Sequence, residues 1–289
     1  MTEEQAYYKK GFHKSVADTH AGRTVENSSK FTLSVLKPGF KVLDVGSGPG
    51  TITVDFAQRY LTKNGGFIIG IEPTQELIDQ ADAYKKEVAP ELKNVKFQLG
   101  SVYKIPFDND TFDLVHAHQV LVHLQDPILA LQEMKRVTKP GGFVCVKDGD
   151  LESSIITPEK YEPLKQSRLL KAKNSNSTDI RGGRKLRERA IRAGYEPENI
   201  VSSLSYWLIG DTRASKQNWA SLLKNREQHG GEVMYPNDKE RDKLAREQNI
   251  ELLDEWGKDV AALYAVTNFE IIYKKPFPWW CVWQELYCS

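Results

Sequence analysis

Short apolar runs that alternate with helix-like segments constrain the fold of this chain most. The runs are KVLDV (41–45), FIIGI (67–71), VKFQL (95–99), FDLVHA (112–117) and FVCVK (143–147). The segments between them have helical spacing and helix-start signals, such as Thr74 before QELIDQ and Asp126-Pro127 before ILALQ. Strands that alternate with helices form parallel sheets with right-handed crossovers. The sequence therefore predicts an α/β fold, a doubly wound Rossmann-like sheet with helices on both faces.

The pattern changes after residue 150. Residues 159–194 predict two polar helices joined by a loop, and residues 200–208 predict another strand. Helices are expected over 213–258 with an interruption near 229–238, and the alternating residues 263–275 predict an edge strand. Because no linker is evident, we expect one domain over residues 1–289. Its expected parts are an N-terminal helical lid (1–40), a cofactor-binding core (41–150) and a C-terminal half (151–289) with a helical insertion on the substrate side and an aromatic tail.

Charge and cysteine content limit the partners and the compartment. The 289 residues include 40 basic and 39 acidic side chains, a formal charge of +1 that gives no reason to expect a nucleic acid partner. The three cysteines match neither zinc spacing nor a disulfide framework, which favours a reducing compartment. The first thirty residues lack the apolar segment of a secretory signal, and no run approaches the roughly 20 apolar residues of a membrane span. We expect a soluble cytoplasmic protein, and its oligomeric state stays open.

The loop GSGPG (46–50) after the first strand indicates that the backbone comes close to a ligand. A dinucleotide loop has the pattern G-x-G-x-x-G/A, and Thr51 occupies its last position here, which argues against a pyrophosphate. Asp44 argues further against it, because a carboxylate opposes the binding of a diphosphate at the following helix N-terminus. A ligand with cationic groups and no phosphate, such as S-adenosylmethionine, is favoured instead.

Glu72, at the end of the second strand, is a second acid at the same edge of the sheet. A carboxylate at this position is able to accept both hydroxyl groups of a ribose. Dinucleotide folds use an acid at the same place, so Glu72 alone does not distinguish the two ligands. A solvated acid beside the next helix is the structural alternative.

Four stretches resemble the successive motifs of class I S-adenosylmethionine-dependent methyltransferases. They are VLDVGSGPG, IEPTQELIDQA, VKFQLGSVYKIPFDNDTFDLVHAHQVLVHLQDP and LQEMKRVTKPGGFVCVKD. The likeness is closest to the quinone-biosynthesis type of small-molecule enzyme (methyltransferase type 11-like); it is specific over residues 19–150 and looser to about 275. The resemblance implies a sheet of about seven strands, mostly parallel with an antiparallel last strand. It also implies S-adenosyl-L-methionine as cofactor and S-adenosyl-L-homocysteine as product.

The resemblance also assigns expected cofactor contacts. These are Arg23, Asp44, Gly46, Ser47, Gly48, Gly50, Glu72, Pro73, Ser101, Val102, His118 and Gln119. The glycine loop would cradle the methionine part with Asp44 at its ammonium group, Glu72 would hold the ribose, and Arg23 would pair with the carboxylate. Residues 101–102 would border the adenine, although the family more often has an acid at position 101. Residues 118–119 would face the transferring methyl group.

Methyl transfer is an in-line displacement, so alignment and the exclusion of water supply most of the acceleration and a base is optional. The candidate bases are His118, His123 and Asp148, with His118 first because it ends a strand at the ligand edge. For His123 a packed residue in a turn is the alternative, and for Asp148 a solvated acid in a loop after the fifth strand. The spacing of His116, His118 and His123 does not match a zinc site, so no metal is expected.

Two groups of aromatic residues are candidates for the substrate side, since aromatic rings suit flat apolar acceptors. A lid over the cofactor would contain Tyr7, Tyr8, Phe12 and His13. An acceptor pocket would contain Trp207, Trp219, Trp256 and Tyr264. Ordinary core packing is the alternative for each of them.

Residues 160–192 contain eleven Lys and Arg residues, which is the strongest argument for an RNA acceptor. A solvated helix face is the ordinary explanation of such a run. We expect transfer of a methyl group to a small organic acceptor. The alternatives are an RNA or protein methyltransferase, a nicotinamide oxidoreductase, and a non-catalytic module that binds S-adenosylmethionine; the acceptor atom is not encoded in these motifs.

Overall fold

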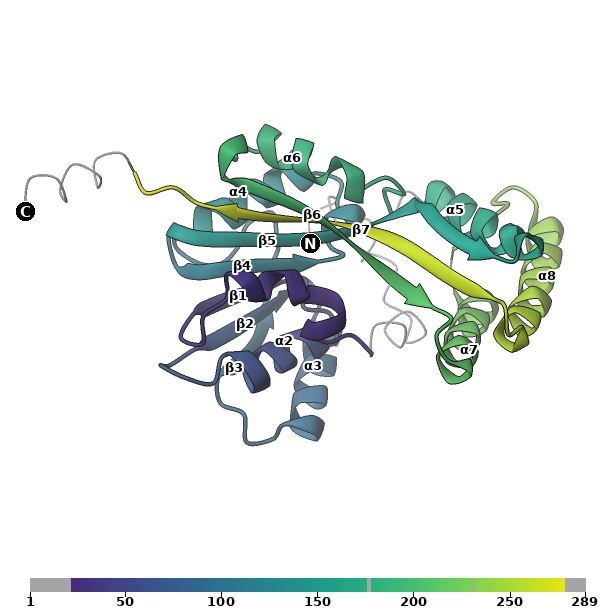
Figure 1. The fold of residues 1–289 in the computed structure, drawn as a ribbon, viewed down its shortest axis with the longest axis horizontal. Coiled ribbons are helices and arrows are strands. Elements are labelled where there is room, and N and C mark those ends of the chain that lie inside the picture. Colours follow the sequence, from purple (N-terminus) through teal and green to yellow (C-terminus); the bar gives the residue numbers. More distant parts are fainter. Residues whose placement is uncertain (1–21, 176–177, 231, 279–289) are drawn as a thin grey trace, which may run out of the picture.

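The computed structural model describes residues 22–175, 178–230 and 232–278. Within these residues one sheet has seven strands in the order β3-β2-β1-β4-β5-β7-β6 (Figure 1). The strands are β1 (Lys41–Val45), β2 (Phe67–Glu72), β3 (Val95–Leu99), β4 (Phe112–His118), β5 (Thr138–Thr157), β6 (Ile200–Ile209) and β7 (Leu263–Lys274). Neighbouring strands from β3 to β5 are parallel, and β7 is antiparallel to both β5 and β6. The expected sheet, mostly parallel with an antiparallel last strand, is confirmed.

Helices form where the sequence predicts them. They are α2 (Thr51–Asp55), continued by the π-helical turn η4 (Phe56–Tyr60), α3 (Gln75–Val88), α4 (Pro127–Val137), α5 (Glu162–Ser175), α6 (Leu186–Arg192), α7 (Arg213–His229) and α8 (Lys239–Lys258). Asp126 caps α4, because its carboxylate accepts the Leu129 amide at 2.9 Å. Thr74 has the extended backbone of an N-cap before α3, but its side chain makes no capping hydrogen bond.

Alternate residues of β1 enter two different cores, which shows that the sheet is covered on both faces. Leu43 and Val45 pack in a cluster with side chains of α4 and α6. Val42 packs in a second cluster with side chains of α2 and α3. Successive side chains of a strand point to opposite faces, so the two clusters lie on opposite sides of the sheet. This arrangement is the doubly wound fold that the sequence predicts.

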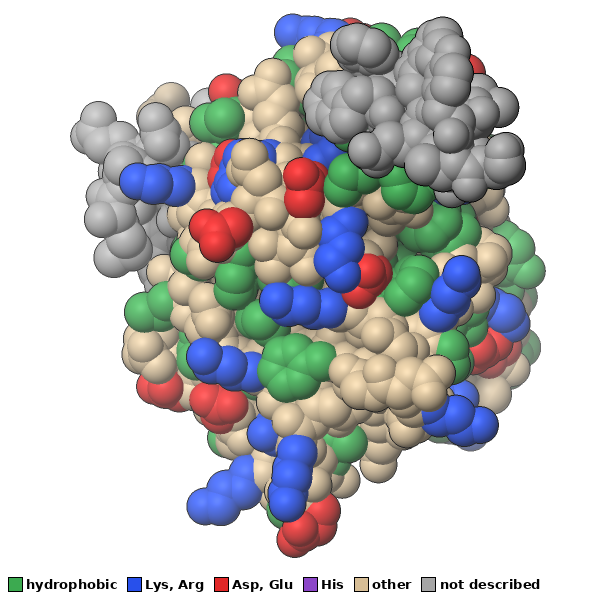
Figure 2. Space-filling view, turned by 90° about the vertical axis from the view of Figure 1, so that its left-hand side faces the viewer, with side chains coloured by type: hydrophobic (Ala, Val, Ile, Leu, Met, Phe, Trp, Pro, Cys, Tyr) green, Lys and Arg blue, Asp and Glu red, His purple; other side chains and the backbone are tan. Residues whose placement is uncertain are grey.

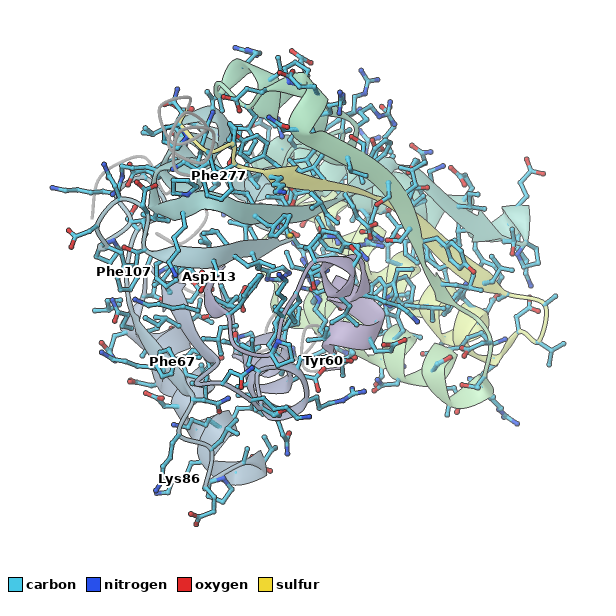
Figure 3. The ribbon with its side chains drawn as sticks, turned by 60° about the vertical axis from the view of Figure 1, so that its left-hand side comes forward. Tyr60, Phe67, Lys86, Phe107, Asp113 and Phe277 are labelled. Atoms are coloured by element: carbon cyan, nitrogen blue, oxygen red, sulfur yellow. The ribbon has the colours of Figure 1, made fainter. Side chains whose placement is uncertain are left out.

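The amino ends of the parallel strands share one edge of the sheet. Phe67 at the start of β2 and Asp113 near the start of β4 lie along this edge, together with Phe107 and Phe277 (Figure 3). Gly141 also belongs to it, since a Cβ atom there would lie 2.5 Å from the Phe277 ring. The carboxyl ends of β1, β2 and β4 therefore meet at the opposite edge, where ligands bind in such sheets.

Two strands differ from the prediction. Residues 263–275 were expected to form an edge strand, but β7 lies between β5 and β6, and β6 is the edge strand of the described sheet. This prediction was wrong because the alternation of apolar and polar residues shows only that one face of a strand is covered. An interior strand has this pattern as well as an edge strand. In addition, β5 extends over 20 residues with an irregularity between Asp150 and Ile155, so the KDGD segment (147–150) lies inside the strand and not in a loop after it.

The far ends of β5, β7 and β6 carry α5, α7 and α8, at the right of Figure 1. A third core fills this part, and in it the Trp219 ring stacks on Tyr264 with centroids 4.7 Å apart. Trp256 is buried in the same core, so three of the four candidate pocket aromatics have the packing role, whereas Trp207 is 38% exposed.

Some expectations have no counterpart in the described residues. The candidate lid residues Tyr7, Tyr8, Phe12 and His13, and two of the cysteines, Cys281 and Cys288, lie outside these residues. Cys145 is buried, and burial raises the pKa of its thiol. None of the helices in the described parts of the chain has the length and apolarity needed to cross a bilayer. The division of the chain into lid, core and C-terminal half, and its cytoplasmic location, stay predictions.

Candidate cofactor site

The GSGPG loop that follows β1 turns tightly against the end of β2. The amides of Gly46 and Ser47 both donate to the Ile71 carbonyl, at 2.9 and 3.2 Å. The three glycines Gly46, Gly48 and Gly50 have φ values of 69°, 55° and 81°. Residues with a Cβ atom rarely adopt this region, which explains three glycines within five positions.

The glycines differ in what surrounds them. A Cβ atom at Gly46 would lie 2.5 Å from the Val120 side chain, and one at Gly50 would lie 2.7 Å from the Phe97 ring. At Gly48 a Cβ atom would meet nothing within 4 Å. The loop is therefore packed against protein at its two ends and open at Gly48, where a ligand would have direct access to the backbone.

Glu72 lies beside this opening and is only partly satisfied. Its residue is 1% exposed, and its Oε1 accepts the Gly48 amide at 2.5 Å. Its Oε2 is buried and has no hydrogen-bond partner in the described structure. Burial raises the pKa of Glu72 to about 8; the Gly48 hydrogen bond lowers it and the nearby Asp44 charge raises it further. A buried acceptor without a donor costs free energy, which two ligand hydroxyl groups would recover.

Asp44 is buried at the end of β1 and has internal partners on both carboxylate oxygens. Oδ2 accepts the Thr53 hydroxyl at 2.5 Å, and Oδ1 lies 2.7 Å from His116 Nδ1. The other ring nitrogen of His116 lies 2.8 Å from the Ser29 hydroxyl. The sequence did not indicate this chain of contacts. Each carboxylate oxygen has a second lone pair, so the expected contact with an ammonium group stays a prediction.

Arg23 precedes the short π-helical turn η2 (Val25–Ser29). This turn begins with reciprocal capping, in which the Thr24 amide donates to Asn27 Oδ1 at 2.8 Å and the Asn27 amide donates to Thr24 Oγ1 at 3.3 Å. Burial lowers the pKa of Arg23 to about 10, so the guanidinium stays charged at neutral pH. Its charge also lowers the pKa of Lys147 on β5, which indicates that Arg23 lies near the carboxyl edge of the sheet.

The end of β4 is tied to its neighbours through Gln119. His118 is in register with Lys147 of β5. Gln119 has a φ of 58°, and its side chain accepts the Gly149 amide at 3.1 Å and donates to Asn268 Oδ1 of β7 at 2.8 Å. Gln119 therefore holds β5 and β7 beside the end of β4, in addition to its expected place at the cofactor.

The two remaining candidate bases have packed surroundings. His123 belongs to the 3-10 turn η5 (Leu121–His123), and its Nδ1 lies 3.0 Å from the Thr178 hydroxyl. Asp148 lies inside β5, so the alternative of a solvated loop acid was wrong. It is fully buried, and burial raises the pKa of its carboxyl to about 7, against the opposing charge of Arg189 on α6. Because side chains alternate along a strand, Asp148 faces away from the side of Lys147.

Comparisons with known proteins identify the family. A model of a methyltransferase domain matches residues 36–227. An uncharacterized methyltransferase of Schizosaccharomyces pombe is 43% identical over 280 residues, which cover 94% of this chain and 98% of the relative. The chain belongs to the class I S-adenosylmethionine-dependent methyltransferases.

Two further relatives agree with this assignment. The methyltransferase chain is 33% identical over 135 residues to a ubiquinone/menaquinone biosynthesis C-methyltransferase of Idiomarina loihiensis, covering 45% of this chain and 50% of that one. The crystal structure of the YcgJ protein of Bacillus subtilis superposes with a TM-score of 0.54 at 17% identity, covering 86% of this chain and 97% of that chain. At this identity the superposition shows the shared fold alone.

The expected adenine contacts of the methyltransferase lie after β3. Ser101 Oγ accepts the Tyr103 amide at 3.2 Å. The Val102 side chain is buried in the core beneath α4 and α6, so its backbone is the part that would border a base. Pro73 follows Glu72 and is half-buried. These positions agree with a ligand that extends from β2 toward β3, and the contacts themselves stay predictions.

An ion pair at the edge of the methyltransferase sheet was not predicted. Lys147 Nζ lies 3.2 Å from Glu270 Oε1, and both side chains are 6% exposed. The hydroxyls of Ser203 and Ser205 donate to Glu270 at 2.7 and 2.6 Å. The available signal was an ionisable residue in each of two apolar segments, the last residue of FVCVK and the third residue of NFEIIY. Among the described residues no group of three His, Cys, Asp or Glu side chains is arranged to hold a metal ion.

The basic segment 160–192 of the methyltransferase is largely neutralised by neighbouring acids. Eight of its eleven cations form ion pairs: Lys160, Lys165, Lys171, Arg181, Arg184, Lys185, Arg189 and Arg192. Arg168 lies over the rings of Trp219 and Tyr264 instead. Basic and acidic side chains are also interspersed on the face at the amino edge of the sheet (Figure 2). Both surfaces therefore carry a mixture of positive and negative side chains.

Proposed function

We propose that this chain transfers a methyl group from S-adenosyl-L-methionine to a small organic acceptor by in-line displacement and releases S-adenosyl-L-homocysteine. Its family supports the reaction class. The observation that carries the proposal is the buried, unpaired Oε2 of Glu72 next to the open backbone of Gly48. A ribose would supply the missing hydroxyl donors, and a nucleoside without phosphates suits an edge that carries two carboxylates.

The residues of the site would divide the binding of the cofactor among them. Glu72 would hold the ribose hydroxyls, and the accessible backbone at Gly48 would contact the methionine part of the cofactor. Arg23 would pair with the carboxylate of that part. Asp44, fixed by its internal partners, would receive the ammonium group. The cofactor supplies a methyl group already activated by a sulfonium centre. His118 would orient the acceptor or accept its proton where the acceptor must ionise.

A small acceptor is favoured over RNA by the pairing of the basic segment, because neutralised cations release few counterions on binding a polyanion. The relative in Idiomarina, named for ubiquinone/menaquinone biosynthesis, also favours a small molecule. Salt-sensitive binding of RNA near physiological ionic strength would instead support the macromolecular alternative.

The replacement Glu72→Gln tests the site. Binding is measured at about pH 9, above the Glu72 pKa of about 8, where the wild-type carboxylate is ionised. The replacement keeps the size of the side chain but removes the charge that strengthens hydrogen bonds from hydroxyl groups, a loss of about 1.5–3 kcal/mol. We expect the affinity for S-adenosylhomocysteine, measured by isothermal titration calorimetry, to fall by a factor of about 10 to 100. Glu76→Gln, at an exposed position in the first turn of α3, is the matched control and should bind like the wild type. Equal affinities of the two variants would refute the ribose contact.

Turnover is tested separately from binding. Transfer of a labelled methyl group is followed with a panel of small oxygen, nitrogen and carbon acceptors and, in parallel, with RNA. Labelled small-molecule product supports the proposal, and labelled RNA alone contradicts it. No binding of S-adenosylhomocysteine to the wild-type protein would overturn the proposal at its first step.

A further inference from the structure

The ion pair between Lys147 and Glu270 is incompletely satisfied on the lysine side. Both residues are 5% exposed. Glu270 accepts two serine hydroxyls in addition to facing the lysine, so its carboxylate is well satisfied. An ammonium group has three donors, and Glu270 is the one acceptor that the described residues place near Nζ. Because unpaired donors on a buried cation cost free energy, this arrangement suits a ligand that brings an oxygen acceptor.

The order of the strands would place Lys147 beside the methyl group of a cofactor bound as proposed above. Along the sheet, β2 with Glu72 comes first, then β1 with the glycine loop, then β4 with His118 and β5 with Lys147. His118 and Lys147 are register partners on parallel strands, so their side chains lie on the same face. A cofactor with its ribose at Glu72 and its methionine part directed toward His118 leaves the region of Lys147 and β7 for the acceptor.

The charges in this region favour an anion. Burial lowers the pKa of Lys147 most, Glu270 opposes this effect, and the charge of Arg23 lowers the pKa further. Arg23 therefore adds a second positive charge within electrostatic range of Lys147. Farther along the same face, Trp207, the register partner of the buried Val266, is 38% exposed and offers apolar surface for the rest of an acceptor.

We propose that Lys147, positioned by Glu270, binds an ionised oxygen of the methyl acceptor, as in a carboxylate. The acceptor class is then a small organic acid whose charged group lies at β5 and whose apolar part lies along β7. This inference rests on the proposed function, since it takes the direction of the cofactor from it. It adds a specificity-determining residue to the expected cofactor contacts.

The test compares two probes of equal size, benzoate and benzamide, which differ in charge. Binding is measured by calorimetry or saturation-transfer NMR on the full chain saturated with S-adenosylhomocysteine. We expect the wild type to bind benzoate at least tenfold more tightly than benzamide, and Lys147→Met to lose this preference. Lys147→Arg should retain part of it. Lys165→Met, which removes another partly buried, ion-paired lysine, on α5, should retain all of it.

A second variant protects the test against misfolding. The double replacement Lys147→Met with Glu270→Gln leaves no unpaired buried charge, and it should also lose the preference for benzoate. The proposal is overturned if the wild type shows no preference, or if either lysine-free variant keeps it. The ligand 5′-methylthioadenosine lacks the amino-acid part of S-adenosylhomocysteine. The proposal is also overturned if Lys147→Met weakens the binding of S-adenosylhomocysteine but not the binding of 5′-methylthioadenosine, because Lys147 would then hold the cofactor carboxylate. Failure of the proposed function would be recognised by a different result, since the wild type would then not bind S-adenosylhomocysteine at all.

Discussion

Asp44 is fixed in place before any ligand arrives. The Thr53 hydroxyl holds one of its oxygens, the His116 ring holds the other, and Ser29 holds the far side of the ring. All four residues are buried. A carboxylate restrained in this way loses little side-chain entropy when it binds a cation, which improves affinity without an additional contact. The same chain of contacts joins the turn η2, which follows Arg23, to the end of β1.

Replacement of His116 tests this positioning role. His116→Phe fits the aromatic environment, where the ring packs edge-on against Phe56, but removes both hydrogen bonds. We expect a loss of about 1–3 kcal/mol in the free energy of unfolding, because Asp44 keeps a buried oxygen without its partner. The affinity for S-adenosylhomocysteine should fall several-fold, measured by calorimetry. Ser29→Ala removes only the outer bond and should have the smaller effect on both quantities. Unchanged cofactor affinity in His116→Phe would show that the contacts serve stability alone.

At the level of elements, the unit formed by β1, the glycine loop and α2 is packed from several directions. The loop contacts the segment after β4 at Gly46 and the ring of Phe97 on β3 at Gly50. Its amides bond to the end of β2. Four strands therefore define the shape of the opening at Gly48. A change at one packed glycine is expected to alter the cofactor site as well as the local backbone.

Gly46→Ala tests the coupling between packing and binding in this loop. The new Cβ would lie 2.5 Å from Val120 and would require a positive φ, so we expect the free energy of unfolding in urea to fall by about 2–4 kcal/mol. S-adenosylhomocysteine affinity should fall with it. Gly65→Ala is the control, since Gly65 also has a positive φ but open space around it. This variant should lose about 1 kcal/mol and keep its affinity; a similar loss of affinity in both would contradict the coupling.

The sequence predicted the elements that carry their own local signals. The first five strands, the glycine loop and the cap at Asp126 follow from short patterns of residues, and the structure confirms these elements. The position of β7 between β5 and β6 did not follow, because strand order depends on pairing between residues more than a hundred positions apart. The length of β5 was missed for a related reason. Its second half pairs with β7 across an irregularity that no periodicity reveals.

The candidate site shows the same division. Asp44, Glu72 and the glycines were found because each follows a strand directly. Lys147 was missed in favour of its neighbour Asp148, and a shift of one residue along a strand exchanges the two faces of the sheet. The residues that support Lys147 come from β6 and β7. No short pattern connects them to β5.

At the scale of the whole molecule, β5 connects all the packed regions. It contributes Val144 and Val146 to the core beneath α4 and α6, Cys145 to the core of the opposite face, and Ile156 to the aromatic core of the C-terminal helices. Asp148 lies in the middle of this strand and is fully buried. Its neighbour on the same face, Asp150, is paired with Arg184. The burial of Asp148 outweighs the backbone amides of Val120 and Val122 and the charge of Arg189, which favour the ionised form, so its ionisation opposes folding.

Asp148 therefore makes the stability of the entire fold dependent on pH. Its pKa rises from the usual 3.8 of an aspartate to about 7 on folding, so the folded state binds the proton more tightly and stability is lost as the pH rises through this window. Asp148→Asn does not titrate. Urea unfolding at pH 4 should give similar stabilities for the two proteins, whereas at pH 8 the variant should gain up to about 4 kcal/mol relative to the wild type. The exposed replacement Asp79→Asn on α3 should show no such trend. A stability difference between Asp148→Asn and the wild type that does not grow from pH 4 to pH 8 would mean that Asp148 stays ionised in the folded state, with the charge of Arg189 compensating for its burial.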